Sequence, residues 1–226
     1  MVDALASISA VDLKVQDDLT VTDDASVGGD LAVTGALDVD GATTTDGITN
    51  AGDFVTDSGT IKLDGNYPTA TGNVALGDTA LDSLTTGTDN VAIGDKAGTA
   101  VTEGTDNTFV GHDAGIANTT GTNNTFIGSL SGDANSTGNN NVSVGKSALS
   151  ANTTASSGTA VGKSALGANT TGAQNTAVGE SCLATNTTAS NNTAVGFIAL
   201  FANTTGNSHV AVGKSALAAI QQEMQM

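Results

Sequence analysis

The sequence has few of the residues that build an ordinary globular core. Its 226 residues include no Trp, one Tyr and five Phe, so aromatic residues make up only 3% of the chain. One or two globular domains would suit this length, but the shortage of bulky side chains argues against them. Apolar residues nevertheless recur in phase along the chain, which random low-complexity sequence would not maintain. An ordered repeat fold is therefore expected in place of a globular domain or a disordered chain.

Positive charge is scarce as well. The sequence contains no Arg, and six Lys face 23 Asp and Glu, giving a formal net charge of −17. Proteins that bind nucleic acid need a cationic surface to neutralise phosphates. The composition therefore excludes nucleic acid as a main partner.

Disulfides and hydrophobic spans are also missing. A single Cys excludes an intrachain disulfide framework. No apolar run approaches the roughly 18 residues that cross a bilayer, so no membrane insertion is expected. Residues 1–7 do not form the charged and apolar regions of a secretory signal.

The chain from Asn73 onward instead consists of a 17-residue unit repeated without insertions. Nine repeats begin at Asn73, Asn90, Asn107, Asn124, Asn141, Gly158, Asn175, Asn192 and His209. A period this strict is typical of a solenoid, in which each repeat forms one coil and coils stack. The sequence therefore predicts an all-β fold with a solenoid of nine coils over residues 73–217.

Two columns of the repeat define the expected strand and corner. Position 5 is always glycine, which predicts a positive φ or a close backbone approach: Gly77, Gly94, Gly111, Gly128, Gly145, Gly162, Gly179, Gly196 and Gly213. Position 4 is always aliphatic and is expected to be a core column: Leu76, Ile93, Val110, Ile127, Val144, Val161, Val178, Val195 and Val212. Aliphatic residues before a glycine corner suit a strand that points into a narrow interior.

The first position of the repeat predicts a ladder of amides. Seven of the nine repeats begin with Asn, and stacking would align these side chains along the solenoid. Each coil carries only two or three sizeable apolar side chains, which is little for an isolated solenoid. Several chains are therefore expected to share one core.

The repeat resembles the head repeats of YadA-type trimeric adhesins, and more closely the Asn-Thr-Ala-Val-Gly arrays of bacteriophage fibre and related virion proteins. The matching segments are Asn90–Gly94, Asn175–Gly179 and Ala165–Gly172. The resemblance covers residues 73 to about 217. It implies a left-handed parallel β-roll that assembles as a homotrimer.

A shorter period precedes the solenoid. Residues 12–65 divide into nine hexads such as Asp30–Gly35 and Ala36–Gly41, with apolar residues at their second and fourth positions. This alternation predicts short strands with one buried face. The segment is similar to the trimeric β-shafts of phage tail fibres, although the hexapeptide β-helix of acyltransferases remains an alternative. Residues 66–72 contain the only Pro and form a linker, and residues 1–11 are expected to be a docking arm.

Several residues could in principle carry chemistry, but their occurrence is better explained by the repeat than by a functional site. The tripeptides at Gly145, Gly162 and Gly213 read Gly-Lys-Ser, but they lack the earlier glycine of a phosphate-binding loop. Cys182 occupies a column of small residues and is expected to be buried. His112 is expected at the surface, although an ion on a trimer axis is an alternative.

Other candidate sites are weighed in the same way. The Asp residues of the hexads, such as Asp38 and Asp40, lack the oxygen cage of a calcium loop. Five Asn-Thr-Thr sequons follow from the repeat and are not expected to carry glycans: Asn118, Asn152, Asn169, Asn186 and Asn203. No cofactor, no metal and no catalytic residues are predicted, and the protein is not expected to be an enzyme.

Aromatic residues depart from the repeat at two places. Phe109 and Phe126 share one column in adjacent repeats and are expected to stack and widen the core. Phe197, Ile198 and Phe201 form either a contact patch for a receptor or neighbour, or a surface covered by the last residues. Residues 218–226 contain helix formers and are expected to be a short helical cap.

Together these features predict a homotrimeric fibre protein of a phage virion, assembled in the host cytoplasm and contributing to host-surface attachment. Its expected partners are two further copies, other virion proteins through residues 1–11, and a host-surface glycan. A fragment of a bacterial trimeric adhesin is one alternative, disfavoured by the lack of a secretory signal. An acyltransferase is another, disfavoured because residues 12–65 contain no His that could act as a base.

Overall fold

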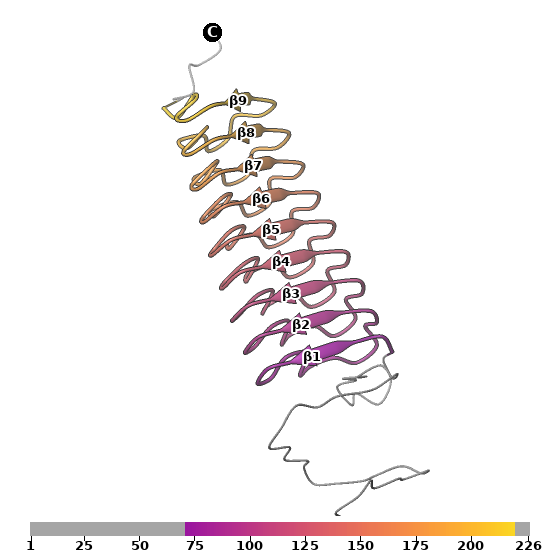
Figure 1. Ribbon diagram of the computed structural model, residues 1–226. Coiled ribbons are helices and arrows are strands. Elements are labelled where there is room, and N and C mark those ends of the chain that lie inside the picture. The colour runs from indigo at the N-terminus through magenta and orange to yellow at the C-terminus, as the bar shows by residue number, and fades with distance from the viewer. Residues whose placement is uncertain (1–70, 220–226) are drawn as a thin grey trace, which may run out of the picture. The chain divides into compact units, whose positions relative to one another are not determined.

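The computed structural model describes residues 71–219 of the chain. The predicted arm (1–11) and shaft (12–65) lie outside these residues, as do most of the linker (66–72) and most of the cap (218–226). The described part is a column of stacked coils with one short strand in each coil (Figure 1). It holds eight complete coils, residues 73–208, and the beginning of the ninth predicted coil.

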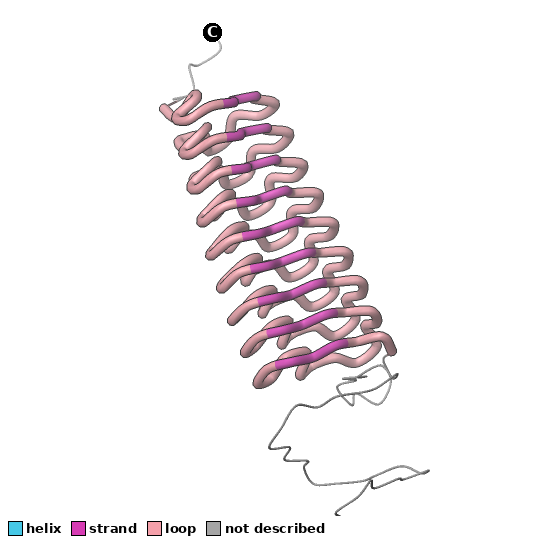
Figure 2. The backbone as a smooth tube through the Cα atoms, in the orientation of Figure 1, coloured by secondary structure: helices cyan, strands magenta, loops and turns pink. Residues whose placement is uncertain are grey.

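The strands form one parallel sheet that runs the length of the column (Figure 2). They are β1 (Val74–Leu76), β2 (Val91–Ile93), β3 (Thr108–Val110), β4 (Thr125–Ile127), β5 (Val142–Val144), β6 (Thr159–Val161), β7 (Thr176–Val178), β8 (Thr193–Val195) and β9 (Val210–Val212). Their order in the sheet follows the sequence, and each residue pairs with the residue 17 positions later, as Val74 does with Val91. The described residues form an all-β parallel solenoid without a helix.

The strands bury their middle residue, which is position 3 of the repeat. Ala92, Phe109, Ala160 and Ala177 at this position have no exposed surface. Because side chains alternate along a strand, positions 2 and 4 must then face outward. The column expected to point into the interior, position 4, therefore lies on the outer face of the sheet, where Val178 is 36% exposed. In most coils a buried leucine at position 9 fills the interior, so a small side chain is sufficient at position 3.

The interior of each coil is filled by its own side chains. They come from position 3 and from positions 8 and 9, which face it. Position 8 is small and buried, as Ala148 is, and position 9 supplies the largest aliphatic side chains. The buried leucines of position 9 are Leu81, Leu149, Leu166, Leu183 and Leu200. One chain thus encloses a continuous core, and a thin core is not a reason for several chains to associate.

Space for the two buried phenylalanines is made at position 9, which is glycine beside them where most other coils have leucine. The rings of Phe109 and Phe126 are 5.6 Å apart at their centroids and inclined by 34°. Position 9 is glycine beside them, and a Cβ added to Gly98 or Gly132 would lie 2.6 Å from a ring carbon. The rings therefore occupy the space that leucine fills elsewhere, and all coils keep 17 residues.

The glycines of position 5 form the corner that ends each strand. Their φ values lie between 123° and 140°. A Cβ at Gly162 would lie 2.6 Å from the carbonyl carbon of Gly179 in the next coil. Both the conformation and the close stacking of the coils therefore require glycine here.

Two ladders of buried asparagines hold successive coils together. In the first ladder, at position 1, the backbone N–H of Asn90 donates to Oδ1 of Asn73 at 2.9 Å. The Asn90 amide also donates to the carbonyl of Gly104, at position 15 of its own coil, at 2.8 Å. The same pattern recurs along the column except at Gly158, which has no side chain to accept, and it ends at His209, whose N–H donates to Oδ1 of Asn192. Apart from this interruption, the first ladder joins each coil to its neighbour and closes it on itself.

The second ladder runs through position 12. The Asn135 side chain donates to Oδ1 of Asn118 at 2.8 Å, and Asn152 donates to Asn135 at 2.6 Å. Asn118 also donates to the carbonyl of Gly121 at position 15. The ladder extends to Asn203, and all six of its members are 0–2% exposed. Every amide in this column therefore replaces its lost water by partners within the solenoid.

Candidate functional site

The outer face of the sheet carries an aliphatic row, defined as the side chains of position 4. Within this row Leu76, Ile93 and Ile127 are 38–40% exposed, and Val195 is 37% exposed. The row runs straight along the column because every strand pairs in the same register. A continuous line of half-exposed aliphatic side chains is a feature of surfaces that associate with other surfaces.

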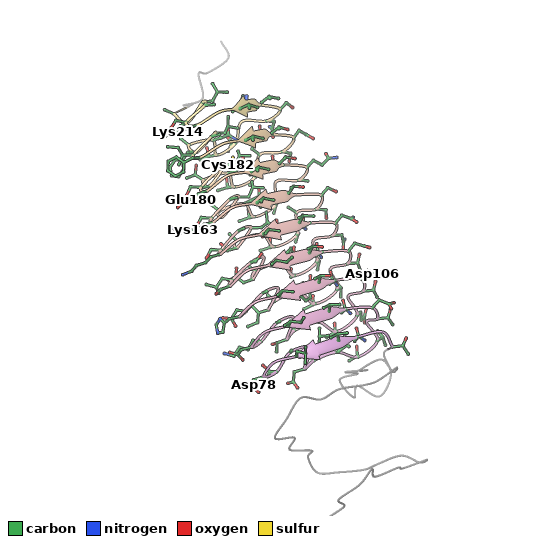
Figure 3. All side chains as sticks on the ribbon, in the orientation of Figure 1. Asp78, Asp106, Lys163, Glu180, Cys182 and Lys214 are labelled. Atoms are coloured by element: carbon green, nitrogen blue, oxygen red, sulfur yellow. The ribbon has the colours of Figure 1, made fainter. Side chains whose placement is uncertain are left out.

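The turn that follows the corner glycine carries the charged side chains of position 6. Figure 3 shows Asp78, Lys163, Glu180 and Lys214 on one side of the column, with Asp106 on the opposite side. Lys163 and Glu180 form an ion pair at 3.3 Å, and both side chains are largely exposed. An exposed pair of this kind contributes little to stability. This side of the column is therefore a surface of mixed charge.

His112 lies in the same column, and its side chain is 53% exposed. Its Nε2 lies 3.4 Å from Oδ2 of Asp95, and its Nδ1 lies 3.1 Å from Oδ2 of Asp113. The structure thus places His112 at the surface, as expected, between two carboxylates.

Asp133 lies near Asp113 in a more enclosed position. Burial raises the pKa of Asp133 above its ordinary value, and the negative charge of Asp113 raises this pKa further. Oδ1 of each Asp is inaccessible to solvent and makes no hydrogen bond among the described residues. Among residues 71–219, no group of three or more His, Cys, Asp or Glu is placed so that it could hold a metal ion.

The aromatic patch of the eighth coil is open to solvent. Phe197 is 46% exposed and Phe201 is 39% exposed, while Ile198 is half-buried. Most of the residues expected to cover this patch, 218–226, lie outside the described part. Within the described part, the structure places the three side chains on one turn.

The side of the column opposite the position 6 turn is polar and mostly uncharged. It consists of positions 13–17, where the coil turns back toward its next strand. Coils one and two carry Asp89, Glu103 and Asp106 here, whereas coils three to eight carry no Asp, Glu or Lys. Positions 14 and 17 of these coils are exposed, as Thr154 and Ser157 are.

Cys182 takes the place of a small buried residue. Its Sγ donates to the carbonyl of Ala194 at 3.2 Å, as the hydroxyl of Ser131 does to the carbonyl of Ser143 at 3.0 Å. Burial raises the pKa of the Cys182 thiol to about 11. A buried thiol with a raised pKa is a poor nucleophile, because the thiolate is the reactive form.

The Gly-Lys-Ser tripeptides do not form phosphate-binding loops. The N–H groups of Gly162 and Ser164 donate to the carbonyls of Val144 and Lys146 in the preceding coil. These backbone donors are consumed by the stacking of coils, so they are unavailable to an anion. The lysines of the tripeptides, such as Lys163, point outward from the turn.

The sequons were interpreted from the sequence as a by-product of the repeat, and their structural role was missed. All five asparagines belong to the second ladder, together with Asn135. Their side-chain nitrogens donate hydrogen bonds inside the solenoid, which leaves no room for a glycan. The signal that could have revealed them is their recurrence every 17 residues, since surface asparagines vary more freely.

No family model matches the chain, and no curated protein or solved structure is detectably similar to it. Residues 71–219 contain no helix long and apolar enough to cross a membrane. The candidate functional features are thus three surfaces of the solenoid: the aliphatic row, the charged and aromatic turn, and the uncharged opposite side.

Proposed function

We propose that the protein is a structural fibre protein of a phage virion, that it assembles as a homotrimer, and that it contributes to attachment to the host surface. The repeat segments Asn90–Gly94 and Asn175–Gly179, which resemble phage fibre repeats, support this role. A parallel solenoid also supports it, because stacked coils produce an elongated body with large surfaces.

The observation that carries the proposal is the aliphatic row on the outer face of the sheet. Its members at Leu76, Ile93, Ile127, Val178 and Val195 remain 36–40% exposed in the single chain. Association of three copies through this face would remove these side chains from water, which stabilises the assembly in proportion to the apolar area buried. Each copy keeps its own core, and the row supplies the contact between copies.

The terminal segments are assigned to attachment and closure. Residues 1–11 would dock on other virion proteins, and residues 218–226 would cover the last coil as a short helix. Closure is needed because Val210 and Val212 of β9 are both 69% exposed, more than the corresponding residues of inner coils. An uncovered end of a solenoid would expose a strand edge that invites aggregation.

Measurement of the mass of the purified full-length chain in solution tests the proposal. Sedimentation equilibrium or mass photometry is expected to give three times the 21.9 kDa of one chain. A stable monomer would refute the trimer.

A variant without residues 1–11 tests the docking role of this arm. It is expected to remain trimeric and to be missing from purified virions. Incorporation at the normal level would show that docking occurs elsewhere in the chain.

A further inference from the structure

The uncharged side of the column has a regular surface of unused hydrogen-bonding groups. In coils four to seven, position 14 supplies the exposed hydroxyls of Thr137, Thr154, Thr171 and Thr188. None of these hydroxyls bonds to another residue within 71–219. They recur about every 4.8 Å, the spacing between neighbouring strands.

A second exposed column runs beside the hydroxyls at position 17. Its members in the same coils are Asn140, Ser157, Gln174 and Asn191. Each has a φ between 58° and 61°, and each backbone N–H donates to a carbonyl of the preceding coil at 2.9–3.1 Å. Their side chains make no hydrogen bond among the described residues. We call the eight side chains of these two columns the uncharged strip.

The backbone beneath the strip is fixed from coil to coil. The hydroxyls of position 13 are used internally, as Ser136 donates to the carbonyl of Thr153 at 3.0 Å. Position 16 is used as well, since the N–H of Asn139 donates to Oγ of Ser156 at 3.0 Å. The exposed groups of the strip therefore stand on a rigid base and lose little freedom when they bind.

We propose that the uncharged strip binds a neutral polysaccharide lying along the solenoid axis. This rests on the proposed role in host attachment and specifies its ligand. Hydroxyl and amide groups are both donors and acceptors, which matches the hydroxyls of a sugar. The spacing of the coils is comparable with the length of one sugar residue in an extended chain, so each coil can contact one residue. Repetition of weak contacts over several coils and three copies then raises the total affinity.

The chemistry of the strip argues against other partners. Nucleic acid and anionic lipid surfaces require Lys or Arg, which positions 13–17 of coils three to eight do not contain. Protein partners are usually held by buried aromatic or aliphatic anchors, and the strip offers only threonine methyl groups. The carboxylates of Asp89 and Asp106 at the same position in coils one and two would repel a polyanion. An uncharged, hydroxyl-rich polymer is the remaining class.

Affinity electrophoresis of the full-length chain tests the proposal. The gels contain a linear β-glucan, a mannan or a neutral galactan, and a parallel gel contains heparin as a polyanion. At least one neutral polymer is expected to retard the protein, and heparin is not. Retardation by none of the neutral polymers would overturn the proposal, and so would equal retardation by heparin.

The location of the site is tested with a quadruple variant, T137V/T154V/T171V/T188V. Valine keeps the shape of threonine and removes the hydroxyl, so affinity for the retarding polymer is expected to fall at least about tenfold. The matched control, T137S/T154S/T171S/T188S, keeps the hydroxyls and is expected to bind within about twofold of the wild type. Unchanged binding by the valine variant would place any sugar contact elsewhere.

Mass photometry of the same preparations separates this inference from the proposed function. A trimer that binds no neutral polymer refutes the polysaccharide ligand alone. A monomer that binds one refutes the trimer and leaves the ligand standing. A thermal melt of each variant confirms that lost binding does not reflect lost folding.

Discussion

At the scale of single residues, the first asparagine ladder has one missing rung. Gly158 occupies position 1 of the sixth coil, and its N–H donates to Oδ1 of Asn141 as in other coils. It has no side chain to accept the N–H of Asn175 in the next coil. Instead, the Asn175 amide reaches back to the carbonyl of Gly172 at 3.1 Å. The first ladder is therefore interrupted at the junction between the sixth and seventh coils.

Replacement of Gly158 by Asn is expected to complete the ladder. An added Cβ would lie 3.1 Å from Oδ1 of Asn141, and the φ of this residue is not positive. One or two new buried hydrogen bonds should raise the free energy of unfolding by about 1–2 kcal/mol. Chemical denaturation followed by circular dichroism measures the change.

Gly158→Ala is the control for this substitution. It should raise the free energy of unfolding by only about 0.4–1 kcal/mol, because alanine reduces the entropy of the unfolded chain and adds no hydrogen bond. A smaller gain for Asn than for Ala would show that the amide does not fit the ladder.

Asp133 makes stability depend on pH. Because its pKa is raised in the folded protein, the folded state holds the proton more tightly than the unfolded state. Its favourable contribution is present below the unfolded pKa of 3.8 and is lost as pH rises through the folded pKa. Asp133→Asn is therefore expected to raise the melting temperature at pH 7, and this gain should shrink as the pH falls through the folded pKa and disappear below about 3.8.

The matched control for Asp133 is Asp106→Asn, which gives the second coil the residue that Asn123 supplies in the third. Asp106 is exposed, so its replacement should change the free energy of unfolding by less than about 0.5 kcal/mol. An equal stabilisation by both substitutions would attribute the effect to net charge and not to burial.

At the scale of the coil, packing depends on the pairing of position 3 with position 9. Most coils take a small residue with Leu, as at Ala160 and Leu166, or Phe with Gly, as at Phe126 and Gly132. The second coil has Ala92 with Gly98, and there Phe109 of the next coil lies against the glycine. Leucine at position 9 adopts a φ near 50°, which glycine also accepts. The two combinations therefore exchange side-chain volume between facing positions without changing the backbone.

A double-mutant cycle at Phe126 and Gly132 tests this exchange. Phe126→Ala leaves a cavity and should cost about 3–5 kcal/mol, and Gly132→Leu crowds the ring and should cost about 1–3 kcal/mol. The double variant recreates the combination of the sixth coil and should recover most of both losses. Denaturation of the four proteins gives the coupling energy, and additive losses would contradict the exchange.

The sequence predicted the period, the strand positions, the corner glycines and the first ladder. These follow from local chemistry, since glycine marks a positive φ and asparagine recurs in register. It did not predict which face of the strand is buried. In the segment Thr176–Val178 valine is more apolar than alanine, so hydrophobicity alone favours Val178 inside. The leucine at position 9, Leu183 in this coil, already fills the interior, and this reverses the choice.

The buried leucines of position 9 and the second ladder also could not be predicted from local sequence rules. Leu166 has a φ of 51°, a conformation that leucine rarely adopts and that no sequence signal announces. Asn169 is part of an Asn-Thr-Thr segment that is typical of an exposed turn, yet it is 1% exposed. Its burial depends on amide partners one coil away, which become visible only when the coils are stacked.

At the scale of the whole molecule, a substitution on the outer face of the sheet distinguishes a monomer from a trimer. Val178→Asp changes a half-exposed side chain, which a monomer should tolerate within about 0.5 kcal/mol. In a trimer formed through the aliphatic row it brings three carboxylates together at the contact. We therefore expect dissociation or a melting temperature lowered by several degrees, measured by mass photometry and calorimetry.

Ala177→Asp is the internal comparison for this experiment. Ala177 is fully buried within its own coil, so a carboxylate there should disrupt the solenoid whether or not it associates. Loss of folding in Ala177→Asp with an unaffected Val178→Asp would show that only the single-chain core matters.

The incomplete first ladder has a mechanical consequence. Bonds between coils run along the column, so a force that stretches the column from end to end passes through every junction in series. The weakest junction then determines the load at which the column opens. At the junction between the sixth and seventh coils, Gly158 leaves the first ladder without a side-chain acceptor, so the backbone bonds and the second ladder carry the load there.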